Sequence, residues 1–114
     1  MKTYVSNGMT YVNLTPHAIM VLNPDGTLKA EIPASGELAR IASDVIRVGE
    51  DKGGIPRSKP VYGEIEGLPE PKPNTVYIVS GILADKTNRM DVTYPLEQVR
   101  DDKGRVIGCY SLKE

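Results

Sequence analysis

The stretch TVYIVS, residues Thr75–Ser80, is the strongest β-strand signal in the chain. Its β-branched and aromatic residues suit a pleated, half-buried surface. Short runs of Val, Ile, Thr and Tyr continue on both sides of it, separated by turn residues, which is typical of a mainly β domain. Gly and Pro number 11 and 9, and helix interiors reject both. We therefore expect a mainly β fold with a minor α component: a small antiparallel sheet domain with at most one or two short helices.

Turn-forming residues divide the N-terminal part of the chain into strands. The dipeptide Asn7-Gly8 readily takes positive φ and closes a tight hairpin after Tyr4-Val5. The segment Asn23–Gly26 has Pro at its second position and Gly at its fourth, which suits a type I turn. The expected strands in this part are Met9–Leu14, Ala18–Leu22 and Thr27–Ile32, and the chain turns again at Pro33–Gly36.

The middle of the chain is ambiguous between strand and helix. The apolar residues of Glu37–Val48 have a helical spacing of three and four, yet several of them are β-branched. We favour strands here, with a helix as the alternative. The expected segments are two short strands, Leu38–Ile41 and Val45–Val48, then a polar, glycine-rich loop, Gly49–Lys59, then a strand, Val61–Ile65.

The C-terminal part contains one segment that is irregular and one strand that closes the domain. Three prolines within Gly67–Asn74 exclude a regular element there. The other expected segments are an apolar stretch, Gly81–Ala84, that ends in a polar loop, Asp85–Asn88; a helical turn or strand edge, Leu96–Val99; a turn, Asp101–Gly104; and a closing strand, Val106–Leu112.

Length and charge bound the class of protein. With 114 residues the chain forms one domain, 1–114. The formal net charge of -1 argues against a dedicated duplex nucleic-acid binder and against a polybasic membrane anchor. No apolar run approaches the ~18 residues of a membrane span, and the N-terminus has no signal-peptide core. A single cysteine, Cys109, excludes an intrachain disulfide and a thiolate cluster for zinc. We expect a soluble protein of a reducing cytosol.

The residue types of common catalytic and metal sites are not grouped in this sequence. Glycine-rich phosphate loops are absent, and His17 has no second histidine to share a metal. His17 could act as a base or ligand contact, but a role in starting a strand is favoured. Glu64 and Glu66 share a strand face and could hold a divalent cation, although a solvated face is the favoured interpretation. We therefore expect no catalytic residues, no metal and no cofactor.

The arginines carry more information than the lysines, because guanidinium groups bind phosphate oxygens bidentately and stack on bases. Several of them lie in or beside loops. Two or three arginines, an asparagine and an apolar floor would suit a small nucleotide. The alternative for each arginine is a surface ion pair, for example Arg100 with Asp101 and Arg89 with Asp91. The six arginines are Arg40, Arg47, Arg57, Arg89, Arg100 and Arg105.

Three strings of the sequence resemble those of small phage and prophage proteins. They are YVNLTPHAI at Tyr11–Ile19, GEIEGLP at Gly63–Pro69 with TVYIVS after it, and VRDDKGRVIGC at Val99–Cys109. Together they extend over nearly the whole chain. On these strings the chain resembles the first family of Thoeris anti-defence proteins, which are phage-encoded sponges.

The resemblance implies a function, a partner and a site. Such proteins capture cyclic ADP-ribose isomers in the cytoplasm of the infected bacterial host without cleaving them, and thereby block anti-phage defence. Their pockets lie at a homodimer interface, and hexamers built as trimers of dimers can also bind cyclic di- or trinucleotides. Met20 would form a pocket floor, Asn88 would contact base or ribose, and Arg57 and Arg105 would meet the pyrophosphate or stack on the purine. Arg89 and Arg100 are second choices.

Two other functions stay open. A small β domain that assembles in a phage particle would have an apolar interface and no nucleotide ligand. A nucleotide-processing enzyme would turn over a cyclic nucleotide, with a metal held by Glu64 and Glu66. The family's stacking aromatic has no Phe or Trp counterpart here, so Tyr or Arg would have to replace it.

Overall fold

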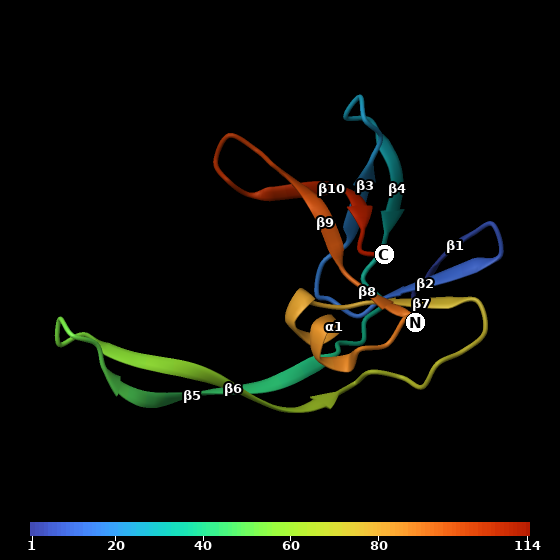
Figure 1. The fold of residues 1–114 in the computed structure, drawn as a ribbon. Helices are drawn as coiled ribbons and strands as arrows, with labels where there is room; N and C mark the ends of the chain where they lie inside the picture. The colour runs from blue at the N-terminus through green and yellow to red at the C-terminus, as the bar shows by residue number, and fades with distance from the viewer.

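The computed structural model describes all 114 residues and is mainly β, with ten strands and one short helix (Figure 1). The elements are β1 (Tyr4–Ser6), β2 (Met9–Asn13), β3 (Ile19–Leu22), β4 (Leu28–Ile32), β5 (Arg40–Glu50), β6 (Pro56–Glu66), β7 (Thr75–Ile78), α1 (Gly81–Thr87), β8 (Val92–Thr93), β9 (Pro95–Arg100) and β10 (Val106–Leu112).

The strands form three small sheets with the orders β1-β2-β7-β8, β4-β3-β10-β9 and β5-β6. The expected all-antiparallel arrangement is wrong, because β2 with β7, β7 with β8 and β3 with β10 are parallel pairs. A parallel pair needs a long crossover between its strands. Here β2 leaves the first sheet, the chain builds β3 to β6 elsewhere, and β7 returns beside β2. That crossover is a long-range event that local sequence patterns do not record.

Most of the expected strands are confirmed. The Asn7-Gly8 hairpin joins β1 to β2 with φ of 50° and 79°, the left-handed geometry that such a two-residue turn requires. The Asn23–Gly26 turn is closed by a hydrogen bond from the Gly26 N–H to the Asn23 carbonyl, 2.8 Å long. Leu96–Val99 is strand rather than helix, since β9 pairs along its length with β10.

The strand β7 separates two small cores. Tyr77 and Val79 pack on one side with Val12, Leu14 and Leu83. Ile78 packs on the other side, in a cluster with Ile19, Ile32 and Cys109. Only 13 of 114 residues are buried, so the chain excludes little apolar surface from water for its length.

A buried asparagine joins the first two sheets. The Asn13 side chain is fully buried, and its Nδ2 donates to the backbone carbonyls of His17 (2.8 Å) and Ile32 (3.3 Å). Its Oδ1 accepts from the backbone N–H and the hydroxyl of Thr15 (3.0 and 2.6 Å). Asn13 ends β2, and Ile32 ends β4, so one amide group sets the angle at which the chain passes between sheets.

The segment from Glu37 to Ile65 differs from its expected structure. One continuous 11-residue strand, β5, replaces the two short strands, and β6 starts at Pro56, inside the expected loop. The polar glycine-rich residues form only the tip, where Asp51 Oδ1 accepts from the N–H groups of Gly53 and Ile55. Both faces of this ribbon are exposed. Its strands therefore need no alternation of apolar and polar residues, which is the signal that would have shown their bounds in the sequence.

The segment after β7 is also different: α1 replaces the apolar stretch and loop expected at Gly81–Asn88. Ser80 caps the helix by accepting from the Leu83 N–H, and Leu83 is fully buried against the first core. Asn88 ends it in the left-handed conformation with φ 54°. Seven residues are too few for helical periodicity to be visible in the sequence. The two-residue strand β8 was not expected.

The shape is far from spherical. The radius of gyration is 17.0 Å, whereas a compact domain of this length has about 13 Å. The reason is the β5–β6 ribbon, which projects from the body as a long arm (Figure 1). The single helix is too short to cross a membrane. We call the β5–β6 hairpin, Arg40–Glu66, the arm.

We predict that Asn13→Ala destabilises the protein by about 2–4 kcal/mol, because the buried Ile32 carbonyl, the His17 carbonyl and the Thr15 N–H each lose their hydrogen bond to Asn13. Asn23→Ala, which removes an exposed side-chain hydrogen bond to Thr27, is the matched control and should cost under about 1 kcal/mol. Urea unfolding monitored by circular dichroism measures both. Equal effects would contradict the role assigned to Asn13.

We predict a large cost for Gly67→Ala at the base of the arm. A Cβ there would lie 2.2 Å from the Leu38 carbonyl oxygen, and φ is +80°. Gly26→Ala is the control, since Gly26 has φ +88° but nothing within 4 Å. Thermal unfolding should show a loss of about 1–2 kcal/mol for the control and clearly more for Gly67→Ala. Similar losses would show that Leu38 moves aside freely.

Candidate functional site

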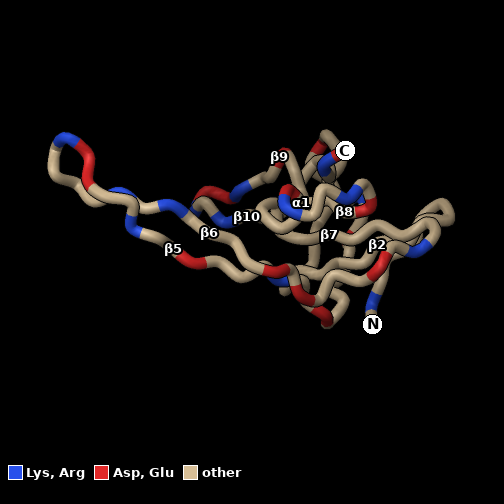
Figure 2. Tube along the Cα trace, turned by 60° about the horizontal axis from the view of Figure 1, so that its bottom comes forward, with Lys and Arg blue, Asp and Glu red and all other residues tan.

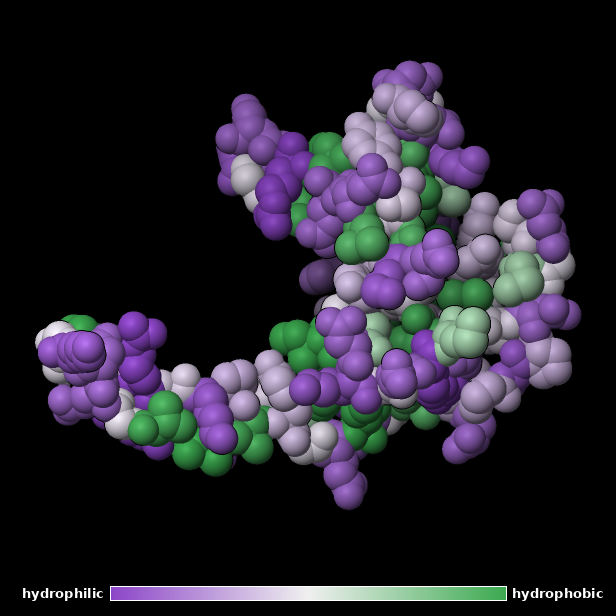
Figure 3. All heavy atoms as spheres, viewed as in Figure 1, coloured by the Kyte–Doolittle hydropathy of each residue, from purple (hydrophilic) through white to green (hydrophobic).

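A cavity of about 460 Å³ lies where the end of β7 and the start of α1 meet β3, β9 and β10. Its volume is within the range of small-molecule sites. Figure 3 shows the broader hollow on this side of the molecule, between the arm and the lobe formed by the second sheet. Hydrophobic side chains line part of both walls of that hollow.

The cavity combines an apolar floor with several polar side chains. Met20 on β3 contributes to the lining, together with Ile19 and Val79. Its polar side chains belong to Thr15, His17, Ser80, Tyr94 and Gln98. No arginine or lysine of the same chain lines it. The arrangement can hold a ring and a sugar by packing and hydrogen bonds, whereas an anionic group would need cations from outside the lining.

Close backbone packing forms one wall of this cavity. Gly108 on β10 lies so near β3 that a Cβ there would be 2.9 Å from Leu22 Cδ1 and 3.0 Å from the Met20 carbonyl oxygen. Cys109 beside it is buried, and burial raises the pKa of its thiol. A neutral thiol is a poor nucleophile, so Cys109 contributes packing to the wall.

Arg57 and Arg105 occupy equivalent places on two hairpin tips. Arg57 lies at the arm tip and its Nε donates to Asp51 Oδ2 (3.0 Å). Arg105 lies at the β9–β10 turn and its Nε donates to Asp101 Oδ2 (3.0 Å). In both cases only Nε is engaged, so the two Nη groups face solvent. These side chains are 68% and 72% exposed, which leaves them free to bind an anion.

The two tip aspartates are held as anions by their surroundings. Backbone N–H donation from Ile55 lowers the pKa of Asp51, and Arg57 lowers it further. Backbone N–H donation from Arg105 lowers the pKa of Asp101 in the same way. Each carboxylate therefore both closes its turn and orients its arginine.

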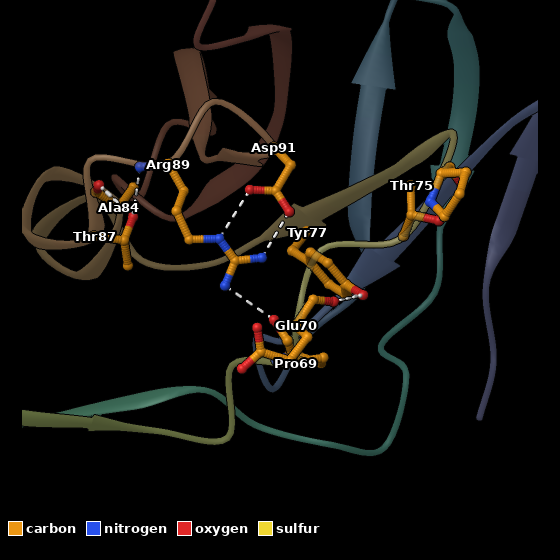
Figure 4. A network of polar contacts seen from close by, with 9 residues as sticks. Pro69, Glu70, Thr75, Tyr77, Ala84, Thr87, Arg89 and Asp91 are labelled. Atoms are coloured by element: carbon orange, nitrogen blue, oxygen red, sulfur yellow. Dashed lines mark hydrogen bonds and ion pairs between the residues drawn. The ribbon is translucent and has the colours of Figure 1, made fainter.

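Arg89 belongs to a polar network inside the chain (Figure 4). Its Nε and Nη2 donate to the two carboxylate oxygens of Asp91 (2.9 and 2.6 Å), and its Nη1 donates to the Pro69 carbonyl (2.9 Å). The guanidinium also lies 5.8 Å from the centre of the Tyr77 ring. The ion-pair interpretation of Arg89 is confirmed. Arg89 attaches the proline-rich connector to the first sheet and has little capacity left for a phosphate.

The remaining expected site residues lie apart from the cavity. Asn88 ends α1 and lines a separate hollow of about 330 Å³ with Arg89 and Lys113. Arg100 donates to the Gly104 carbonyl (2.8 Å) and pairs with no carboxylate, so the expected ion pair with Asp101 is wrong. Asp101 takes Arg105 instead, because the turn brings the two side chains together across the hairpin.

Of the six site residues that the resemblance implies, one chain therefore places only Met20 in the cavity, and it does not gather the arginines around it; His17, considered as a ligand contact, also lines it. Sequence reasoning missed Thr15, Ser80, Tyr94 and Gln98, which come from four separate segments of the chain. Ser80 alone had a local signal, since a serine just before an apolar run is a helix cap. Glu64 and Glu66 lie on β6, and no group of three or more His, Cys, Asp or Glu that could hold a metal ion is found.

Comparison with protein-family models, with curated proteins and with solved structures finds no match to this chain. The geometry of the cavity, the arginine tips and the resemblance of the sequence strings are therefore what a functional proposal rests on.

We predict that Asp91→Asn destabilises the protein at pH 7 by about 1–2 kcal/mol, because Arg89 loses its paired carboxylate in a half-buried setting. The hydrogen bonds from Arg89 lower the folded-state pKa of Asp91 below 3.8. The stability that this ion pair contributes is fully present above the pKa of Asp91 in the unfolded chain. It is lost as the pH falls through the lower pKa of Asp91 in the folded protein.

The measurement is unfolding free energy against pH for wild type and Asp91→Asn. The difference between the two should narrow below about pH 4. Asp85→Asn, on an exposed position of α1, is the control and should match wild type at every pH. A difference that stays constant down to pH 2 would show that the charge of Asp91 is unimportant.

Proposed function

We propose that this protein is a phage-encoded sponge that binds cyclic ADP-ribose-type signals, and related cyclic oligonucleotides, without cleaving them, in the cytoplasm of the infected host. The observation that carries the proposal is the cavity floored by Met20, which has the size and the mixed apolar and hydroxyl lining that a nucleoside needs. The resemblance of the three sequence strings supplies the ligand class. A sponge needs tight binding and no chemistry.

The charge of such a ligand must be met by a second copy or by the hairpin tips. The cavity lining has no arginine or lysine, while Arg57 and Arg105 present free Nη groups on projecting tips. Arg105 directly precedes Val106, which lines the cavity. Nanomolar capture requires about -12 kcal/mol. Two guanidinium forks on a pyrophosphate, in a site that a second chain closes from water, can supply much of that.

The second candidate is an assembly domain of a phage particle. The observation that favours it is the arm, whose apolar residues are exposed on both of its strands, for example Val45 (67%) on β5 and Val61 (38%) on β6. A surface of this kind is typical of a chain that binds another chain. The assembly function needs that contact and does not need the cavity.

One experiment separates these functions. The protein is incubated with a cyclic ADP-ribose isomer, desalted and denatured, and the released nucleotide is identified by mass spectrometry. Intact nucleotide released in proportion to protein supports the sponge. Altered nucleotide supports the enzyme that the sequence left open, and no retained nucleotide supports the assembly domain.

We predict that Arg57→Ala and Arg105→Ala each weaken capture at least tenfold, because each removes one free guanidinium fork. Lys29→Ala, on an exposed position of β4, is the matched control and should leave affinity unchanged. Isothermal titration calorimetry with the same nucleotide measures all three. Unchanged affinity in both arginine variants would remove the tips from the site.

A further inference from the structure

The arm is a two-stranded ribbon that lacks support from the rest of the chain. Beyond its base every residue of β5 is exposed, and β5 has β6 as its only sheet neighbour. Its strands have 11 residues each, so the arm is about 36 Å long. An isolated two-stranded hairpin is marginal in water. A further strand beside it would supply the missing support.

The two edges of the arm differ in their capacity to pair. The β6 edge contains Pro56 and Pro60, which lack an N–H and blunt an edge. The β5 edge contains no proline between Arg40 and Glu50. The open edge of the arm is therefore that of β5.

Val45 shows which way the β5 backbone points. It faces Pro60 across the ribbon, which has no N–H to offer. The Val45 N–H donates to the Asp44 carboxylate of its own strand (2.7 Å). This N–H is turned toward the open edge and is held there by a neighbouring exposed side chain, which a pairing strand can displace.

Two β5 strands placed side by side in opposite directions are complementary in backbone regularity and in charge. Pairing with β6 is regular from Ser43 to Arg47, a segment centred on Val45, and irregular on both sides of it. Two β5 strands laid antiparallel about Val45 therefore join two regular segments. The same arrangement sets the Arg40 end of each strand beside the Glu50 end of the other, opposite charges that favour pairing.

The charges of the whole arm fit this antiparallel arrangement. Figure 2 shows several basic residues along the outer part of the arm, beside an acidic segment at the tip, and acidic residues toward the base. The outer part has a surplus of cations and the inner part a surplus of carboxylates, so reversing one arm along the other brings unlike charges together. The outer charges are Arg47, Lys52, Arg57 and Lys59 against Glu50 and Asp51, and the inner ones are Asp44, Glu64 and Glu66 against Arg40.

We propose that a second copy of this chain pairs its β5 with this one, antiparallel about a two-fold axis at Val45, to form a four-stranded sheet β6-β5-β5-β6. The outward N–H and carbonyl groups of Ser43, Val45 and Arg47 then form about six backbone hydrogen bonds between the copies. The proposal rests on the proposed function in one respect, because that function needs a second copy of the chain and the pairing supplies it. The pairing itself forms without nucleotide. Mass and nucleotide capture are therefore measured separately, and either can fail alone.

The first test is Val45→Pro, which removes the N–H at the proposed two-fold axis. Val45→Thr keeps the N–H and the β-branched shape and is the matched control. Analytical ultracentrifugation without nucleotide should show a dimer for wild type and Val45→Thr, and at least tenfold weaker association for Val45→Pro. A monomeric wild type, or a Val45→Pro variant that associates like Val45→Thr, overturns the proposal.

The second test does not depend on how well the proline variant folds. Facing residues in a hydrogen-bonded antiparallel pair have Cα atoms about 5.5 Å apart, within disulfide reach. Val45→Cys should therefore form a covalent dimer on mild oxidation. Ser58→Cys, on the far strand, would be separated from its equivalent by at least three strand spacings, about 14 Å, and should not. Cross-linking that is equal at both positions, or absent at position 45, overturns the proposal.

Discussion

The amide side chain of Asn13 is the interaction on which the arrangement of this molecule depends. All four of its hydrogen bonds are made inside the protein, and they join the end of β2 to the loop that follows and to the end of β4. The cavity lies just beyond this junction, with Thr15 and His17 in its lining. A change in the angle between the first two sheets would move β3, and with it Met20, relative to β7 and α1. The position of the candidate site is therefore a consequence of one satisfied buried amide.

The second constraint is the small size of the core. Two clusters on either side of β7 hold nine of the buried residues, while a long arm carries apolar side chains in water. Because so much of the chain lies in an unsupported ribbon, the protein removes less apolar surface from water than a compact domain of the same length. A partner strand along the open edge of β5 would give the arm part of the support that its own chain does not supply.

The arginines divide by what their guanidinium groups already bind. Arg89 uses Nε and both Nη groups within the chain, on Asp91 and on the Pro69 carbonyl, and is a structural residue. Arg57 and Arg105 use only Nε, on an aspartate that also closes the turn. Arginines of the second kind are oriented and still able to bind, which is what an anion site requires. Sequence spacing alone does not separate the two kinds, because both lie near an aspartate.

The sequence by itself determined the β class, most strand positions and the tight turns, because these depend on neighbours within a few residues. Asn7-Gly8 and the run Thr75–Ile78 needed nothing more. Among the site residues it indicated Met20, on an apolar strand, but not Thr15, Tyr94 or Gln98. Only the tertiary structure decided the parallel pairing of β2 with β7, the helix at Gly81–Thr87 and the single long arm. These depend on which distant segments meet, and on whether a face is covered or left in water, and neither is recorded in the local order of residues.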